Sequence, residues 1–361
     1  MELKRKNYII YHDHFDILAG TERVLINLIE FLTSKKANVT LVLFSEKKDP
    51  VFNLEKFNIN IINLNVKNNE NKFVYYYKLL KSTKKLFSIY NFPKDTVAIS
   101  TNYLAAYILY LAKPKHLEIV SCEHFSVTVM NKLSLYLRKL FYNKVNVVML
   151  TKEETIIIKE KYNPKNCVCI PNAVPFESEK YNENKTKNIL AIGRITSQKG
   201  FDLLVEAFSK INNEYPDWTL NIVGDDYGDK DSLDNFIEQH KIKNIKINPS
   251  TSNIQEYYRN AAFYVLSSRF EGFGMVLVEA MAHGLPCISF NCKSGPSDII
   301  TNNVDGFLIE DFNIYEMAAK IKLLIQDEEL RLIMSQNAHQ KVKYFHKDVI
   351  NSKWIVFFNS I

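Results

Sequence analysis

Short runs of β-branched and aromatic residues alternate with longer segments of helical period, and this alternation constrains the fold most. It is typical of βα units, whose strands pair in parallel. In the first half we expect strands at 8–12, 38–45, 59–65, 96–101, 117–122 and 146–151, and helices at 20–34, 73–90 and 130–143. In the second half we expect strands at 188–193, 219–223, 245–248, 263–267 and 286–290, and helices at 199–213, 230–240, 274–283, 313–326 and 328–342. The fold class is therefore α/β.

The best linker candidate is a proline-bracketed turn, 171–175, followed by a polar stretch, 177–187. At 361 residues the chain exceeds the usual size of one hydrophobic core, so two domains are expected. We predict two Rossmann-like, doubly wound domains that face a central cleft and bind ligands beyond the carboxyl ends of their strands. The predicted parts are an N-terminal domain, a C-terminal domain and a final helix that packs back on the first domain, over 1–175, 176–345 and 346–361.

Composition excludes several classes. A content of 47% hydrophobic and 24% charged residues is that of an ordinary globular protein. No signal-peptide pattern follows the N-terminus and no uncharged stretch is long enough to span a bilayer, so we expect a cytoplasmic protein. The five cysteines lack a C-x-x-C pair, which favours reduced, buried thiols over disulfides or zinc.

Positive charge is concentrated in the first half. The net charge is +6 overall, but +10 over residues 1–180 and −4 over the remainder. Aromatic residues and lysines interleave near 73–90 and 130–144, including Lys81, Lys84, Lys85, Arg138 and Lys139. Such basic amphipathic helices suit an anionic membrane surface, and we predict peripheral attachment to the inner face of the cytoplasmic membrane. The alternative is two helices that pack on the sheet and leave their lysines in solvent.

The segment 267–286 holds two carboxylates around a glycine-rich turn from a strand into a helix. Gly272 and Gly274 allow a tight turn and a close approach to a ligand. Free N–H groups at the start of the helix suit a phosphate. The two carboxylates suit hydroxyl pairs, because each accepts two hydrogen bonds. We expect donor contacts from the residues of this turn and helix, Glu271, Gly272, Phe273, Gly274, Met275 and Glu279.

A second strand-to-helix turn carries cations. Gly193 and Arg194 end a strand, and Lys199 stands at the start of the next helix. Arg194 can make forked contacts to phosphate oxygens, and Lys199 adds a point charge. One cationic and one carboxylate-bearing turn together indicate a nucleotide-diphosphate-sugar site.

These segments resemble glycosyltransferase family 4, whose members have the GT-B fold. The resemblance rests on Gly193-Arg194 with Lys199-Gly200, on a Glu-x7-Glu motif, and on segments 283–286, 295–300 and 305–308. It implies a donor bound by the C-terminal domain, an acceptor bound by the N-terminal domain, and retention of anomeric configuration. Arg194 and Lys199 would hold the diphosphate, Glu271 the donor sugar and Glu279 the ribose. The chain departs from the family at 223–227, which lacks a second glycine, and at Ala19-Gly20, where many members have two glycines.

In the N-terminal half the resemblance places Gly20 under the reacting groups and His124 beside the donor sugar. We therefore count His124 with Glu271, Arg194 and Lys199 as catalytic candidates. His14 and Glu123 are further acceptor-side candidates. The spacing of His12 and His14 resembles a metal pair but lacks a third ligand, so we expect no metal and no cofactor.

The sequence thus predicts a retaining glycosyltransferase that moves a hexose or N-acetylhexosamine from a UDP-sugar to a lipid-linked or cell-surface glycan, such as a capsule or lipopolysaccharide. In the resembling mechanism the acceptor attacks from the front face, and the departing phosphate oxygen takes its proton. A GT-B-like nucleotide-sugar epimerase would share the site. A nucleic-acid-binding protein would use the basic half, but no recognised module supports it and no nucleic acid is expected.

Overall fold

The computed structural model describes residues 2–15, 20–45, 53–67, 71–124, 132–176 and 186–361. The chain packs as two compact units. The first joins Met1–Pro175 to Lys347–Ile361, and the second is Phe176–His346. The division falls at the predicted linker, and the C-terminal helix packs with the first unit.

The described part of the first unit has a seven-stranded parallel sheet with strand order β3-β2-β1-β4-β5-β6-β7. Six strands match the predicted runs within two residues at either end. The seventh is short, and only the alternation of Cys167 and Cys169 signals it. The strands are β1 (Asn7–His12), β2 (Asn38–Ser45), β3 (Asn60–Val66), β4 (Val97–Ser100), β5 (Glu118–Glu123), β6 (Asn146–Met149) and β7 (Asn166–Cys169).

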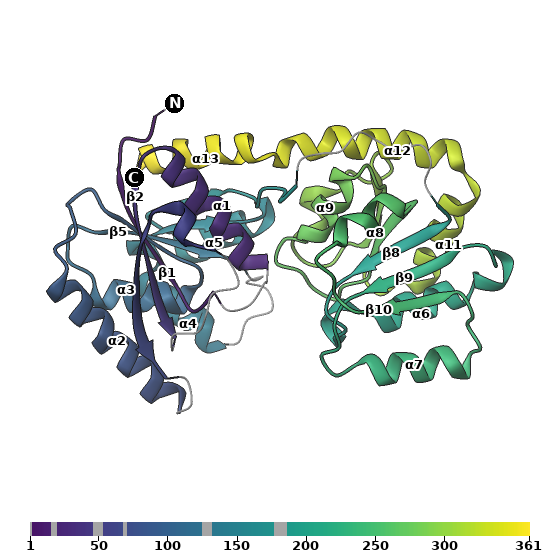
Figure 1. The fold of residues 1–361 in the computed structure, drawn as a ribbon, viewed down its shortest axis with the longest axis horizontal. Coiled ribbons are helices and arrows are strands. Elements are labelled where there is room, and N and C mark those ends of the chain that lie inside the picture. The colour runs from purple at the N-terminus through teal and green to yellow at the C-terminus, as the bar shows by residue number, and fades with distance from the viewer. Residues whose placement is uncertain (1, 16–19, 46–52, 68–70, 125–131, 177–185) are drawn as a thin grey trace. The chain divides into compact units, whose positions relative to one another are not determined.

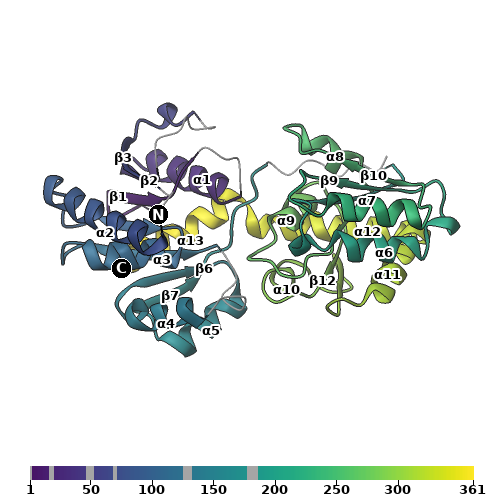
Figure 2. The ribbon, with the colours of Figure 1, turned by 90° about the horizontal axis from the view of Figure 1, so that it is seen from below.

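Helices cover both faces of this sheet (Figures 1 and 2). Successive strand residues point to opposite faces, so Ile10 packs with α1 and α13 while Ile9 packs with α2 and α3. Both faces are apolar, as a parallel sheet requires. The helices are α1 (Gly20–Ser34), α2 (Lys72–Ile89), α3 (Tyr103–Ala112), α4 (Lys132–Phe141), α5 (Lys152–Tyr162) and α13 (Lys347–Ser360).

Two helices of this unit, α3 and α5, were not predicted. The α3 sequence is apolar almost throughout, so it shows no helical period, and it packs against both α2 and α4. The Asn102 side chain caps its N-terminus by accepting from the N–H of Ala105. The α5 helix also has a visible cap, Thr151, with acidic residues in its first turn and lysines in its last. Capping residues would have identified both helices where the apolar pattern did not.

The described part of the second unit has a six-stranded parallel sheet with strand order β10-β9-β8-β11-β12-β13. The unpredicted β13 begins at a glycine and is four residues long. The strands are β8 (Asn188–Ile192), β9 (Thr219–Val223), β10 (Ile245–Asn248), β11 (Phe263–Leu266), β12 (Cys287–Phe290) and β13 (Gly306–Ile309). The helices are α6 (Phe201–Ser209), α7 (Lys230–Gln239), α8 (Ile254–Asn260), α9 (Met275–Ala282), α10 (Pro296–Ile299), α11 (Ile314–Gln326) and α12 (Glu328–Lys341).

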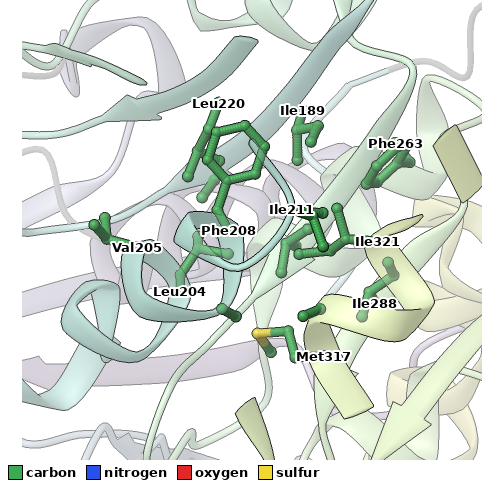
Figure 3. Packing of buried hydrophobic residues seen from close by; sticks show 14 of the residues in the cluster. Ile189, Leu204, Val205, Phe208, Ile211, Leu220, Phe263, Ile288, Met317 and Ile321 are labelled. Atoms are coloured by element: carbon green, nitrogen blue, oxygen red, sulfur yellow. The ribbon is translucent and has the colours of Figure 1, made fainter. Parts of the chain in front are cut away.

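The core of the second unit lies between its sheet and the helices α6 and α11. Figure 3 shows Phe208 of α6 and Ile321 of α11 packed among strand residues such as Ile189 and Phe263. All four side chains are fully buried. This core fixes the positions at which β8 and β11 end, and therefore the positions of the loops that follow them.

Each sheet reverses its strand order once, between β1 and β4 in the first unit and between β8 and β11 in the second. At such a switch point the loops from adjacent strands leave in opposite directions and open a crevice at the carboxyl edge. The predicted site residues follow β1, β5, β8 and β11. Among the described residues, no helix is long and apolar enough to cross a membrane.

Candidate functional site

The loop after β8 is held tightly against the loop after β11. Gly200 has a left-handed backbone, with φ of +63°, and a Cβ there would lie 2.1 Å from the backbone oxygen of Ser267. The Ser267 hydroxyl donates to the Lys199 carbonyl at 2.9 Å, and the Arg269 N–H donates to the Gln198 carbonyl at 2.8 Å. Glycine is therefore required at position 200, and the two loops form one rigid edge.

This edge brings Lys199 and Glu271 into contact. The Lys199 ammonium lies 2.7 Å from Oε1 of Glu271, and the Ser268 hydroxyl donates to the same oxygen at 2.6 Å. The side chains keep 15% and 9% of their surface exposed, so the pair borders solvent rather than lying in the core. A cation and a carboxylate at the carboxyl edge of the sheet offer complementary contacts to a phosphate and to sugar hydroxyls.

Arg194 lies at the same edge but does not join that pair. Its side chain is exposed, and its guanidinium carbon lies 5.4 Å from the centre of the Tyr227 ring. The loop after β9 is close because Gly224 packs on Gly193, where a Cβ would come within 1.8 Å of the Gly193 oxygen. Tyr227, four residues after the end of β9, was not predicted as a site residue, although aromatic side chains commonly line ligand sites.

The glycine turn before α9 has the predicted form. Gly274 has φ of +94°, and α9 begins at Met275. The side chain of Phe273 is buried and packs against Phe345 at a ring distance of 5.8 Å. The side chain of Phe273 therefore contributes to packing, and only its backbone is left for ligand contacts. The sequence-based prediction counts the whole residue as a donor contact. Gly272 lies at the turn, and its carbonyl accepts from the Ser294 hydroxyl at 3.4 Å.

Glu279 is buried in α9 and its carboxylate is held by a tyrosine that the sequence did not indicate. The Tyr258 hydroxyl donates to Oε2 of Glu279 at 2.8 Å. Burial, followed by the charge of Glu279, raises the pKa of Tyr258 well above its usual value, so the hydroxyl stays protonated. The His283 ring stacks on Tyr258 at 5.0 Å, and its Nδ1 lies 2.8 Å from the Glu279 carbonyl. These contacts fix the direction of the Glu279 side chain.

In the first unit, three buried polar side chains form a chain at the β1–β4 switch point. Nδ1 of His12 lies 2.9 Å from the Thr101 hydroxyl, and Nε2 lies 3.1 Å from Oε1 of Glu22. The His14 ring lies 6.3 Å from that of His12, and Gly20 begins α1, where an added Cβ would meet no described residue within 4 Å. The sequence indicated His14 and Gly20 but gave no role to Glu22 or Thr101.

His124 follows β5 near this cluster. Burial, together with the neighbouring His12, lowers the pKa of His124 to about 4, so its ring is neutral at pH 7. A neutral imidazole donates one hydrogen bond and accepts another, which fits a contact to a sugar hydroxyl.

Glu123 and Arg138 differ from the predictions. Nη2 of Arg138 lies 2.6 Å from Oε2 of Glu123, and the hydroxyls of Tyr142 and Ser121 donate to Oε1 at 2.5 and 2.9 Å. The Arg138 guanidinium also lies over the Tyr103 ring, 3.9 Å from its centre. Arg138 is fully buried, so it is not part of a membrane-facing surface, which corrects that prediction. Glu123 has partners inside the unit for both carboxylate oxygens, so its contacts indicate a structural role rather than acceptor binding.

No three His, Cys, Asp or Glu residues gather in a metal-binding arrangement within the ranges that the structure describes. The absence of a metal or cofactor from the reaction stays a prediction.

Comparisons with known proteins agree with this architecture. The model of the family described as "Glycosyl transferases group 1" matches residues 174–341. An uncharacterized glycosyltransferase of Haemophilus influenzae is 30% identical over 350 residues, covering 93% of this chain and 95% of that protein. The N-acetylgalactosamine-N,N'-diacetylbacillosaminyl-diphospho-undecaprenol 4-alpha-N-acetylgalactosaminyltransferase of Campylobacter jejuni is 26% identical over 345 residues, covering 91% and 93%.

Among solved structures, Anabaena HepE in complex with UDP superposes with a TM-score of 0.80 at 18% identity, covering 98% of this chain and 100% of that one. The predicted GT-B architecture of two Rossmann-like domains is confirmed by this likeness and by the two parallel sheets. The chain belongs to the group 1 glycosyl transferases, and the protein is a glycosyltransferase.

Proposed function

We propose that the protein is a retaining enzyme of glycosyltransferase family 4 that transfers a hexose or N-acetylhexosamine from a UDP-sugar to a lipid-linked or cell-surface glycan. The contact between Lys199 and Glu271 at the carboxyl edge of β8 and β11 carries the proposal. The UDP in the HepE complex supports the choice of nucleotide, and the diphospho-undecaprenol substrate in the name of the Campylobacter relative supports the class of acceptor.

The second unit binds the donor in this proposal. Lys199 and Arg194 bind the diphosphate, because both are cations at this edge of the sheet. Glu271 then turns from Lys199 to the sugar hydroxyls, and Glu279, directed by Tyr258, accepts from the ribose hydroxyls. The N–H groups at the start of α9 lie beside the phosphates.

The chemistry is a front-face substitution. The acceptor oxygen forms a bond to the anomeric carbon on the side from which the diphosphate leaves, and the departing phosphate oxygen takes the acceptor's proton. Arg194 and Lys199 stabilise the negative charge that develops on the diphosphate. Because these side chains supply the positive charge, the reaction is expected to need no metal. Activity that survives dialysis against EDTA would support this, whereas activity restored only by a divalent cation would contradict it.

The donor is tested with the purified chain and a panel of UDP-, GDP- and ADP-sugars. We expect a thermal shift and slow hydrolysis with a UDP-sugar and weaker effects with the others. A chain that responds to none of them would contradict the donor site. Conversion of one UDP-sugar into another without an acceptor would instead favour the epimerase.

The first unit binds the acceptor at the inner face of the cytoplasmic membrane. The helices α2 and α4 expose large apolar side chains between lysines, with Phe73 82% and Tyr136 60% exposed. Anionic lipid attracts the lysines while the aromatic rings enter the headgroup layer. The exposed members of this surface are Phe73, Tyr77, Lys81, Lys84, Lys85, Leu133, Tyr136, Lys139 and Leu140.

Co-sedimentation with vesicles that contain phosphatidylserine tests this surface. Changing Lys81, Lys84 and Lys85 to Gln is expected to weaken binding by about a hundredfold, at roughly 1 kcal/mol per lysine near an anionic surface. The matched control changes Lys241, Lys243 and Lys246, which are exposed on the second unit, to Gln. Equal binding by the two triple variants would contradict the assignment of this surface.

A further inference from the structure

The hydrogen-bonded chain Thr101–His12–Glu22 lies where the strand order of the first sheet reverses. His12 ends β1, Thr101 follows β4, and Glu22 is in the first turn of α1. All three side chains are at least nine-tenths buried, with 5%, 3% and 5% of the residue surface exposed. Three buried polar groups at a switch point occupy the place where sheets of this kind bind ligands.

The charge of Glu22 decides which atom donates in the hydrogen bond between His12 and Glu22. Burial raises the pKa of Glu22, but the hydrogen bond from His12 and the nearby backbone outweigh burial and hold the pKa below its usual value. The carboxylate is therefore ionised at neutral pH and only accepts hydrogen bonds. Nε2 of His12 then donates to Oε1 of Glu22, and Nδ1 of His12 shares a hydrogen bond with the Thr101 hydroxyl.

Among the described residues, Oε2 of Glu22 has no hydrogen-bond partner, and this oxygen is buried. A buried carboxylate oxygen without a donor is unfavourable, so native structures seldom retain one without a reason. His12 and the start of α1 hold the carboxylate in place, which leaves Oε2 ready to receive a donor from a ligand.

We propose that Oε2 of Glu22 accepts a hydrogen bond from a hydroxyl group of the glycan acceptor. This inference rests on the proposed function and deepens it by naming the group that recognises the acceptor. A carboxylate with a low pKa is a weak base, so Glu22 positions the acceptor hydroxyl but does not remove the hydroxyl proton. This agrees with a phosphate oxygen of the leaving group as the base. His12 and Thr101 are positioning residues, because they act through Glu22.

The test uses the full chain, a labelled UDP-sugar that the wild type hydrolyses, and octyl glycosides of glucose, galactose, N-acetylglucosamine and N-acetylgalactosamine as acceptor probes. Glu22→Ala is expected to raise the KM of the best glycoside at least about tenfold, the loss typical of a charge-assisted hydrogen bond. Donor affinity and donor hydrolysis should stay within about twofold, a change that corresponds to less than half a kcal/mol.

Two further variants separate binding from folding. Glu22→Gln keeps the volume and a partner for His12, so it folds if Glu22→Ala does not, and a smaller rise in KM is expected. Thr101→Val removes the hydrogen-bond partner of Nδ1 of His12 and should raise the same KM by a few-fold with donor affinity unchanged. The control is Glu30→Gln, the same change on an exposed position of α1, which should leave the kinetics unaltered.

The outcomes are distinct. An acceptor KM unchanged by both Glu22 variants would overturn the role of Glu22 and leave the proposed function standing. Loss of donor affinity, or wild-type hydrolysis without transfer to any of the four glycosides, would also count against a hydroxyl-binding role for Glu22. A wild type that neither binds nor hydrolyses a nucleotide sugar would remove the proposed function itself.

Discussion

Two ion pairs, one in each unit, have nearly the same length but different surroundings. Arg138 and Glu123 lie 2.6 Å apart with 0% and 2% of their side chains exposed, whereas Lys199 and Glu271 lie 2.7 Å apart with 15% and 9% exposed. The first pair is enclosed by Tyr142, Ser121 and Tyr103, and the second borders solvent at the carboxyl edge of the second sheet. Loss of one partner from an enclosed pair leaves an uncompensated buried charge, while a pair at the edge can exchange its partner for a ligand.

The largest expected effect concerns the enclosed pair. Arg138→Ala leaves the Glu123 carboxylate buried without its cation and should lower the free energy of unfolding by about 3–5 kcal/mol. Urea denaturation measures the loss. Lys139→Ala, on the exposed neighbour in α4, is the control and should change stability by less than about 0.5 kcal/mol. Similar losses in the two variants would show that burial of Arg138 does not matter.

The pair at the edge should respond in activity instead. Glu271→Ala or Lys199→Ala is expected to lower kcat by about 10²–10³-fold, because each removes a group placed for the transition state. Unfolding free energy should fall by about 1–2 kcal/mol, less than in Arg138→Ala, because 15% of the Lys199 side chain is exposed and water can screen the pair. Transfer assays and urea curves on the same samples test both statements, with Glu238→Ala on α7 as the exposed control. A stability loss as large as that of Arg138→Ala would remove the contrast between the pairs.

His124 extends the comparison to pH. Its pKa of about 4 in the folded protein lies below the ordinary 6.5, so the unfolded chain binds more protons between these values. The stability that neutral His124 contributes is therefore full above pH 6.5 and is lost as the pH falls toward 4. We expect this contribution to be about 1–2 kcal/mol, less than the full pKa shift would give, because His124 as a residue is half-buried. His124→Gln should flatten this part of the stability profile, and an unchanged profile would contradict the assignment.

The smallest effect concerns the tyrosine that holds Glu279. Tyr258→Phe keeps the stack with His283 but removes the hydrogen bond to Oε2, at a cost of about 1 kcal/mol. UDP affinity, measured by calorimetry, should fall by about fivefold. Tyr257→Phe, on the adjacent residue of α8, is the control. Equal affinities for the two variants would mean that Glu279 does not depend on Tyr258.

The residues in the loops that follow strands were identifiable from the sequence because glycines, cations and carboxylates succeed apolar runs there. This holds for Gly193, Lys199, Glu271 and Gly274, all of which lie at the carboxyl edge of the second sheet. The side chains that hold site residues in place were not identifiable from the sequence. Tyr258, for example, lies on a different helix from Glu279 and contacts it only because the unit packs the two helices together. Thr101 likewise meets His12 only because β4 pairs with β1.

The sequence by itself determined the α/β class, most strand positions and the linker near residue 175, because these follow from local periodicity and turn chemistry. Only the tertiary structure decided which charges are enclosed and which remain available. In the sequence, Arg138 cannot be distinguished from the exposed basic residues of the same helix, yet its side chain is fully buried and paired with Glu123. Burial depends on what packs above a residue from distant parts of the chain, and no local pattern carries that information.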